Sequence, residues 1–156
     1  MKIKIYWLVI ALGLIAAPIS KANEQSELAD TVNSYMIESY NYVLNINLLI
    51  ELCALERYLE VDTNSTSFNQ KLHANIKRFA ELGKVNDYSA NKVAAEVEIK
   101  FNAFLQGVRY GGFIADNFVR TQYPKGMCTP EIKKDLDSKI DELIKKDEFK
   151  ISDIDD

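Results

Sequence analysis

The side chains that could support acid–base or nucleophilic chemistry are few and scattered. His73 is the only histidine. The sequence has no glycine-flanked serine motif whose hydroxyl this histidine could activate as a nucleophile. Glu96 and Glu98 lie two positions apart, a spacing that turns side chains away from each other on a helix. The same holds for Asp135 and Asp137. These patterns predict a surface or half-buried histidine and solvated carboxylates, so we expect a protein that is not an enzyme.

The sequence also lacks the common metal-binding and cofactor-binding motifs. The sequence has no HExxH, no Glu-x-x-His pair and no CxxCH haem-attachment motif. Two cysteines and His73 would supply too few ligands for a structural metal. A haem held between Met36 and His73 is the alternative, but two isolated ligand types carry little specificity. We expect neither a metal nor a cofactor.

The two cysteines, Cys53 and Cys128, are better explained as a structural pair. An even pair in an exported chain is typical of one disulfide, and two free thiols are the alternative. Closing a loop of about 75 residues would cost the unfolded chain roughly 4 kcal/mol of conformational entropy. We therefore expect a Cys53–Cys128 bond.

The start of the chain predicts export. Lys2 and Lys4 precede an apolar run over residues 5–17, and the small residues Ser20 and Ala22 stand where a signal peptidase reads the chain. This pattern is typical of a secretory signal peptide, residues 1–22. The alternative is a membrane anchor, but the run is shorter than the roughly 20 residues that span a bilayer. We expect a periplasmic or secreted protein with no membrane insertion after cleavage.

The remaining 134 residues have the usual size of one domain. They carry 23 acidic and 16 basic residues, a net charge of −7, because three of the basic residues precede position 23. Nucleic acids and anionic membranes reward clustered lysine and arginine. The charge therefore disfavours both as partners.

Apolar residues recur at spacings of three and four along four segments, which predicts an all-α fold. The expected helices cover about 26–61 and 66–82, then a stretch from Asp87 or Ser89 past Phe118, and a last one from an N-cap at Thr129 to Lys146. Pro130 suits the first position of that last helix. We expect residues 23–146 to form a small bundle of about four helices pinned by one disulfide. Residues 147–156 form an acidic tail that we expect to fray.

Glycines interrupt the third helical segment. Gly107 and Gly111 are four residues apart and share a helix face, and Gly112 follows directly. Each glycine costs a helix about 1 kcal/mol relative to alanine. We expect a neighbouring backbone to approach closely there, and a helix break near Gly112 is the alternative.

Part of the chain resembles a known family. The segment 104–146, with Gly107-Val108 and Cys128-Thr129-Pro130, is similar to the C-terminal half of periplasmic immunity proteins that neutralise type VI secretion amidases. Residues 48–56 resemble an earlier helix of that family, whose cysteine takes part in a disulfide. The similarity covers under half of the chain that follows the signal peptide, and a further cysteine of the family is missing near Ala103. The resemblance implies an all-α, often homodimeric protein that occludes an amidase active site.

With no chemistry predicted, binding is the function that remains. Aromatic residues interleaved with cations carry much of the energy of protein interfaces, and such residues gather late in the third helix and in the loop after it. The expected partner-binding residues are Arg109, Tyr110, Arg120, Tyr123 and Lys125. The alternative is that aromatics such as Tyr110 only cover neighbouring helices.

The sequence thus predicts an exported, non-catalytic helical protein that binds a protein partner. An immunity protein against a secreted peptidoglycan amidase is the specific form of this hypothesis. The alternatives are a secreted bacterial factor that acts on a host or competitor protein, and a periplasmic chaperone or stress protein.

Overall fold

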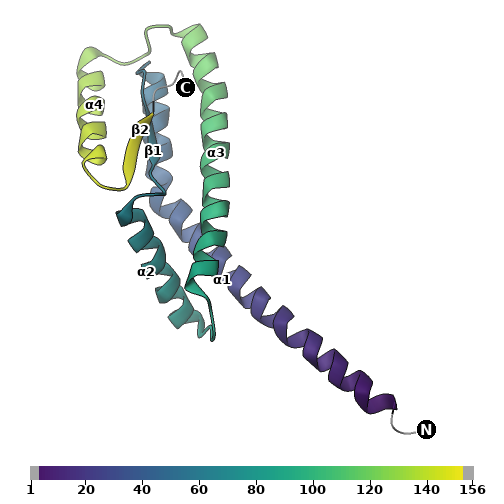
Figure 1. Cartoon of the computed structure of the whole chain (residues 1–156). Helices are drawn as coiled ribbons and strands as arrows, with labels where there is room; N and C mark the ends of the chain where they lie inside the picture. The colour runs from purple at the N-terminus through teal and green to yellow at the C-terminus, as the bar shows by residue number, and fades with distance from the viewer. Residues whose placement is uncertain (1–3, 153–156) are drawn as a thin grey trace.

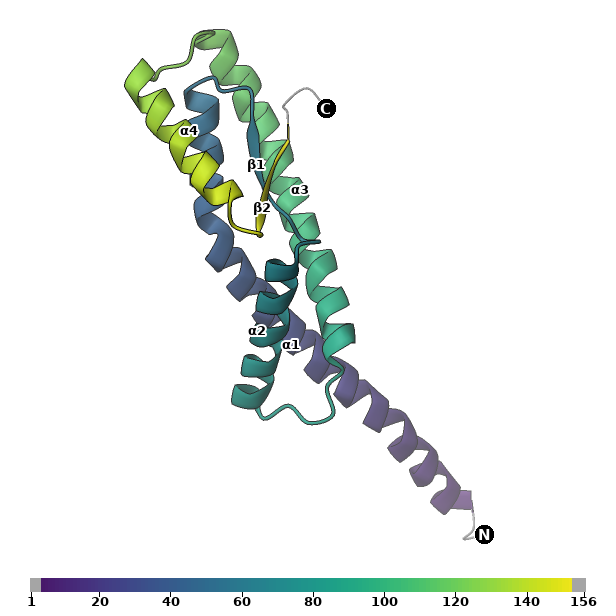
Figure 2. The same ribbon diagram turned by 60° about the vertical axis from the view of Figure 1, so that its left-hand side comes forward.

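Two long helices form the frame of the fold. The computed structural model describes residues 4–152, with side chains for 21–112, 117–118 and 120–152. Helix α1 (Lys4–Leu52) packs along α3 (Ala90–Gln122), and the N-terminal part of α1 extends beyond the other elements (Figures 1 and 2). Helix α2 (Thr66–Gly83) packs against both, and α4 (Pro130–Ile144) lies near the C-terminal half of α1. The predominantly helical fold is confirmed.

One hydrophobic core joins these helices. The inward face of α1 is buried at every third or fourth residue from Leu28 onwards, and it meets the apolar stripes of α2 and α3. Tyr40 lies at the centre, with Phe68 and Phe101 as ring neighbours at centroid distances of 6.0 and 5.7 Å. Tyr42 and Leu49 of α1 lie outside this buried face and are 39% and 46% exposed.

The first helix ends nine residues earlier than predicted. It stops at Leu52, and Ala54 takes a positive φ of 50°, which turns the chain back. Strand β1 (Tyr58–Val61) then replaces the expected last turns of helix. Asn47 of α1 holds this strand in place: its side chain donates to the Leu59 carbonyl and accepts from the Leu59 amide, both at 2.9 Å. These bonds satisfy both the N–H and the C=O of Leu59. The Asn47 amide therefore stabilises β1 against α1.

The expected frayed tail is wrong for residues 147–152. Strand β2 (Phe149–Ser152) pairs antiparallel with β1, with Val61 opposite Phe149 and Tyr58 opposite Ser152. Asp147 accepts hydrogen bonds from the backbone and hydroxyl of Ser67 at the start of α2. Phe149 is buried beside the Tyr40 ring. The tail is ordered because its apolar and acidic residues both find partners; residues 153–156 lie outside the described part.

The ends of the shorter helices follow the predicted capping chemistry, with one exception. The Thr129 hydroxyl accepts from the Ile132 amide, and Pro130 occupies the first turn of α4, as predicted. Ser65 caps α2 in the same way. At the other end of α2 the residue in the left-handed conformation is Lys84, with a φ of 51°, and not the adjacent Gly83.

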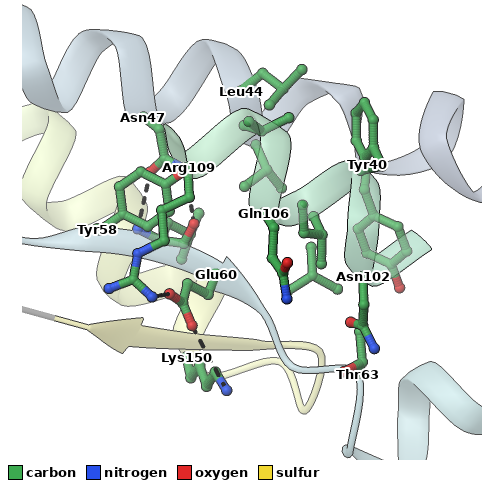
Figure 3. A pocket seen from close by; sticks show the side chains of 16 residues that line it. Tyr40, Leu44, Asn47, Tyr58, Glu60, Thr63, Asn102, Gln106, Arg109 and Lys150 are labelled. Carbon is green, nitrogen blue, oxygen red and sulfur yellow. Dashed lines mark hydrogen bonds and ion pairs between the residues drawn. The ribbon is translucent and has the colours of Figure 1, made fainter. Parts of the chain in front are cut away.

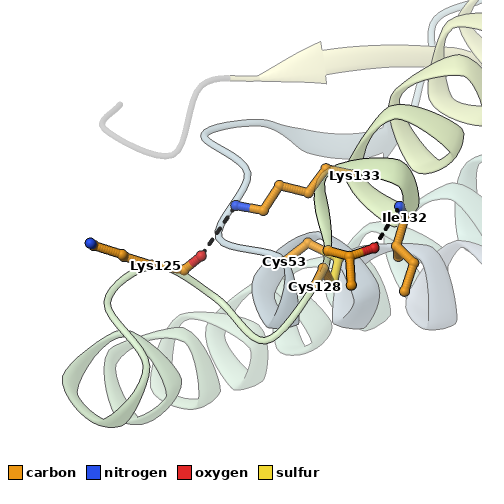
Figure 4. Close-up of a disulfide and its surroundings, with 6 residues drawn as sticks. Cys53, Lys125, Cys128, Ile132 and Lys133 are labelled. Carbon is orange, nitrogen blue, oxygen red and sulfur yellow. Dashed lines mark hydrogen bonds between the residues drawn. A yellow bond between two sulfur atoms is a disulfide. The ribbon is translucent and has the colours of Figure 1, made fainter.

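The disulfide between Cys53 and Cys128 is confirmed (Figure 4). It joins the residue after α1 to the residue before the α4 N-cap, with a Cα–Cα distance of 4.8 Å. The Met127 amide donates to the Leu52 carbonyl at 2.8 Å. Gly126 has a φ of +71°, and a Cβ there would lie 2.6 Å from the Cys53 carbonyl. Only glycine fits this close approach of two backbones.

Within the part of the chain whose side chains are described, no helix is both long enough and apolar enough to cross a bilayer.

Candidate functional site

The five predicted partner-binding residues do not form one surface. Arg109 and Arg120 are eleven residues apart, about 16 Å along α3, and both turn toward the body of the protein. Arg109 forms an ion pair of 3.1 Å with Glu60 of β1. Arg120 donates to the Leu55 carbonyl at 3.4 Å. Both guanidinium groups therefore tie α3 to the segment after α1.

The other three predicted residues point in different directions. Tyr123 and Lys125 lie in the loop beside the disulfide, where the Lys125 carbonyl accepts from the Lys133 ammonium at 3.2 Å (Figure 4). Tyr123 is 49% exposed. Tyr110, by contrast, faces solvent from the middle of the C-terminal half of α3, with 69% of its surface exposed. Of the five, it is the one whose side chain is both large and fully available.

Tyr110 belongs to an exposed stripe of α3, described at six positions, that we call the α3 outer face. A helix turns 100° per residue, so positions 99, 103, 107, 110, 111 and 118 fall on one side. Each is exposed, and the three large apolar members, Ile99, Tyr110 and Phe118, are 71%, 69% and 69% exposed. The stripe extends about 28 Å from the first to the last of these residues. Large apolar side chains exposed along one side of a helix make this face a candidate interaction surface.

The two glycines of this stripe correct an expectation. A neighbouring backbone was expected against Gly107 and Gly111, but nothing within the described structure lies within 4 Å of a Cβ built at either position. The helix does not break there, because α3 continues to Gln122. Close approach occurs instead at Gly112, where a Cβ would meet a Glu51 carboxylate oxygen at 2.8 Å. The space beside Gly107 and Gly111 is open.

A second feature is a cleft on the opposite side of α3, between that helix, α1 and β1. Its volume is about 250 Å³. Val43 and Leu44 of α1 and Leu105 and Val108 of α3 contribute apolar lining. We call this hollow the β1–α3 cleft.

Charged groups gather at one end of the cleft, as Figure 3 shows. Glu60 accepts from Arg109 at 3.1 Å, from the Ser152 hydroxyl at 3.0 Å, and pairs with Lys150 at 3.7 Å. Arg109 and Lys150 side chains are each 49% exposed, so both remain accessible. Burial raises the pKa of the nearby Tyr58 hydroxyl, and Glu51 and Glu60 add to the effect, so this hydroxyl stays neutral. Two partly exposed cations thus lie beside Glu60 at this end of the cleft, and the Glu51 carboxylate lies near enough to act on the same tyrosine.

Uncharged polar groups line the other part of the cleft. Asn102 and Gln106 extend from α3 toward Thr63 and β1 (Figure 3). Their side-chain amides take part in none of the hydrogen bonds found among the described residues. An amide both donates and accepts, so these groups can bind a ligand that does the same.

The residues considered for catalysis are separated. His73 is exposed on α2. Glu96 accepts from Ser26 and pairs with Lys100, and Asp137 pairs with Arg57. Among the described residues, no three histidine, cysteine or acidic side chains are grouped so that they could hold a metal ion. The described structure therefore does not bring these residues together into one site.

Comparisons with protein-family models, with curated proteins and with solved structures gave no match.

Sequence reasoning found Arg109 and Tyr110 but missed the surfaces to which they belong. The outer face could have been found from the spacing of Ile99, Gly107 and Tyr110, since all fall outside the buried stripe of that helix. The cleft could not, because Glu60 and Lys150 are 90 positions apart and become neighbours only through the β1–β2 pairing.

Proposed function

We propose that this chain is an exported, disulfide-stabilised helical protein that binds another protein through the α3 outer face. The observation that carries the proposal is the row of exposed apolar residues, Ile99, Tyr110 and Phe118, beside the open space at Gly107 and Gly111. Tyrosine and phenylalanine bring large contact areas at a small cost in side-chain entropy. The three side chains lie on one side of α3, as they would on a helix that packs into a partner's groove or against a partner's helix.

The glycines support the same proposal. In an exposed helix each one costs about 1 kcal/mol relative to alanine, and nothing in the described structure uses the space that they leave. Small residues four apart allow a second backbone to approach a helix closely, a principle best documented between helices in membranes. A partner that packs against Gly107 and Gly111 would also contact Tyr110, one turn away on the same side.

Two features of the chain support export. The basic and apolar start of the chain is typical of a signal peptide, and the Cys53–Cys128 bond suits an oxidising compartment. Among the residues whose side chains are described, the first buried one is Leu28, so cleavage after Ala22 would remove no described core residue. It would remove the Lys21–Asp87 ion pair, whose side chains are 61% and 74% exposed. Such exposed pairs contribute little to stability.

The class of partner is a further part of the proposal. The resemblance of residues 104–146 to immunity proteins suggests a peptidoglycan amidase of the type VI secretion class, inhibited in the periplasm. The α3 outer face lies within this segment from Phe104 onwards, so the candidate surface and the family resemblance concern the same helix. The acidic charge of the chain also suits a protein partner better than a nucleic acid.

Site-specific photo-crosslinking in the producing bacterium tests this function. A photoreactive amino acid replaces Tyr110 in one strain and Phe118 in another, and Leu82 in the control strain. Leu82 is 68% exposed but lies at the end of α2. We expect both test positions to give an adduct with the same protein and the control position to give none.

Adducts at all three positions, or at none, would contradict binding through this face. Purified amidases of the type VI class, mixed with the protein and separated by gel filtration, test the partner class. An amidase that is inhibited and co-elutes supports an immunity function. A crosslinked partner outside this class would exclude the amidase proposal and leave the binding face standing.

A further inference from the structure

The β1–α3 cleft has the three kinds of group that a peptide carboxyl terminus would need. Arg109 and Lys150 can attract a carboxylate, Asn102 and Gln106 can bond to peptide amides, and Val43, Leu44, Leu105 and Val108 can cover an apolar side chain. We propose that the cleft binds the carboxyl-terminal end of a short peptide. This inference does not depend on the proposed function of the α3 outer face.

The charged end is suited to an anion that arrives from solvent. Glu60 pairs with both Arg109 and Lys150, and each cation keeps about half of its side-chain surface exposed. Arginine binds carboxylates with two parallel hydrogen bonds, and half of its side-chain surface is open here. A neutral ligand would form no ion pair with either cation.

The strand supplies main-chain groups of the right kind. In an antiparallel pair, the main-chain N–H and C=O of every second residue bond to the partner strand. Those of the residues in between point to the opposite edge. Leu59 bonds to Asn47 at that edge, and Asp62 donates to the Glu148 carbonyl across the ladder. Val61 is two residues beyond Leu59, so its N–H and C=O point to the same edge as those of Leu59, and Val61 lines the cleft. A peptide amide could bond to Val61 much as the Asn47 amide bonds to Leu59.

The size of the cleft limits the ligand. Its volume of about 250 Å³ lies below the common range for drug-sized ligands, roughly 300–1,000 Å³. One or two residues with a terminal carboxylate would occupy it. A simple fatty acid could meet the cations and the apolar wall, but it would form no hydrogen bond with the amides of Asn102 and Gln106, whereas a peptide could.

Nuclear magnetic resonance titration of the ¹⁵N-labelled protein, purified in the form that the cell accumulates, tests this proposal. The probes are acetyl-Ala-Leu with a free carboxylate, the same peptide as its carboxamide, and octanoate. We expect the free acid to shift the amide signals of Val61, Thr63 and residues 102–109. The carboxamide and octanoate should each bind at least tenfold more weakly.

Two variants test separate parts of the site. Arg109→Gln should weaken acetyl-Ala-Leu at least tenfold, and Lys92→Gln, an exposed lysine on the same helix, should not. Asn102→Leu/Gln106→Leu keeps every charge, and it should weaken the peptide but leave octanoate unchanged; Asn91→Leu is its control. Thermal unfolding shows whether each variant is folded.

Three results would overturn the proposal. The first is equal binding of the acid and its carboxamide, which would show that the cations play no part. The second is octanoate binding as tightly as the peptide, which would identify an apolar anion site without amide recognition. The third is an absence of signal shifts at the cleft at millimolar peptide.

Discussion

At the scale of single residues, asparagine and glycine have roles that depend on the segment packed beside them. The buried side-chain amide of Asn47 takes the place of a neighbouring strand, since it bonds to both the N–H and the C=O of Leu59. Gly126 and Gly111 have opposite environments: the first lies against the Cys53 backbone with a positive φ, and the second faces open space. The composition alone cannot distinguish these two glycines, because the difference arises from which segment lies beside each one.

This difference gives a prediction for glycine substitutions. Gly111→Ala should raise the free energy of unfolding by about 1 kcal/mol, because alanine favours the helix and meets no neighbour. Gly126→Ala should lower it by more than about 1 kcal/mol, because a side chain is strained at positive φ and would clash with Cys53. Urea unfolding measures both values. A destabilised Gly111→Ala would show that this position is covered in the free protein.

At the scale of elements, the sequence predicted the helices well and the strands not at all. Helices α2, α3 and α4 have apolar stripes and capping residues such as Ser65 and Thr129, which act within a few residues of each helix end. Strands β1 and β2 are four residues long, too short for a clear alternation. Their stability comes from partners far along the chain, so no local pattern marks them. The tail was expected to fray for the same reason.

The C-terminal strand is also held by a polar cluster. Glu148 accepts from the Tyr40 hydroxyl at 2.7 Å and from the Lys71 ammonium at 3.0 Å. The Lys71 ammonium also lies over the Tyr40 ring. Burial acts to raise the pKa of Glu148, but the hydrogen bonds from Tyr40 and Lys71 outweigh it and lower that pKa below its ordinary value. The charged carboxylate is therefore the form that the fold stabilises.

The pKa shift predicts how stability depends on pH. A carboxyl group with a lowered folded-state pKa stabilises the protein above its unfolded pKa and stops doing so as pH falls through the folded value. Glu148→Gln should therefore cost about 1–3 kcal/mol at pH 7 and progressively less below about pH 4.5. Urea unfolding from pH 7 to pH 3 measures this, with the exposed Glu142→Gln as control. A loss that is independent of pH would mean that the charge of Glu148 does not matter.

At the scale of the whole molecule, one helix presents two different surfaces. Helix α3 is fixed along its inner side by the core, by Arg109 on β1 and by Arg120 on the segment after α1. Its outer side is left as the exposed stripe of Ile99, Tyr110 and Phe118. The disulfide and the short sheet hold the ends of α1 and α4 beside it. A rigid support of this kind keeps a binding face in one conformation, which reduces the entropic cost of association.

The most direct test of the central claim is the affinity for the partner that crosslinks to Tyr110 and Phe118, measured by calorimetry. The account predicts that Tyr110→Ala/Phe118→Ala loses at least 2 kcal/mol of binding free energy, about thirtyfold in Kd, with its helical circular dichroism unchanged. Leu82→Ala should bind within twofold of the unaltered protein. Full affinity in the first variant, together with a comparable loss in Tyr123→Ala/Lys125→Ala, would contradict the account and place the interface at the disulfide end.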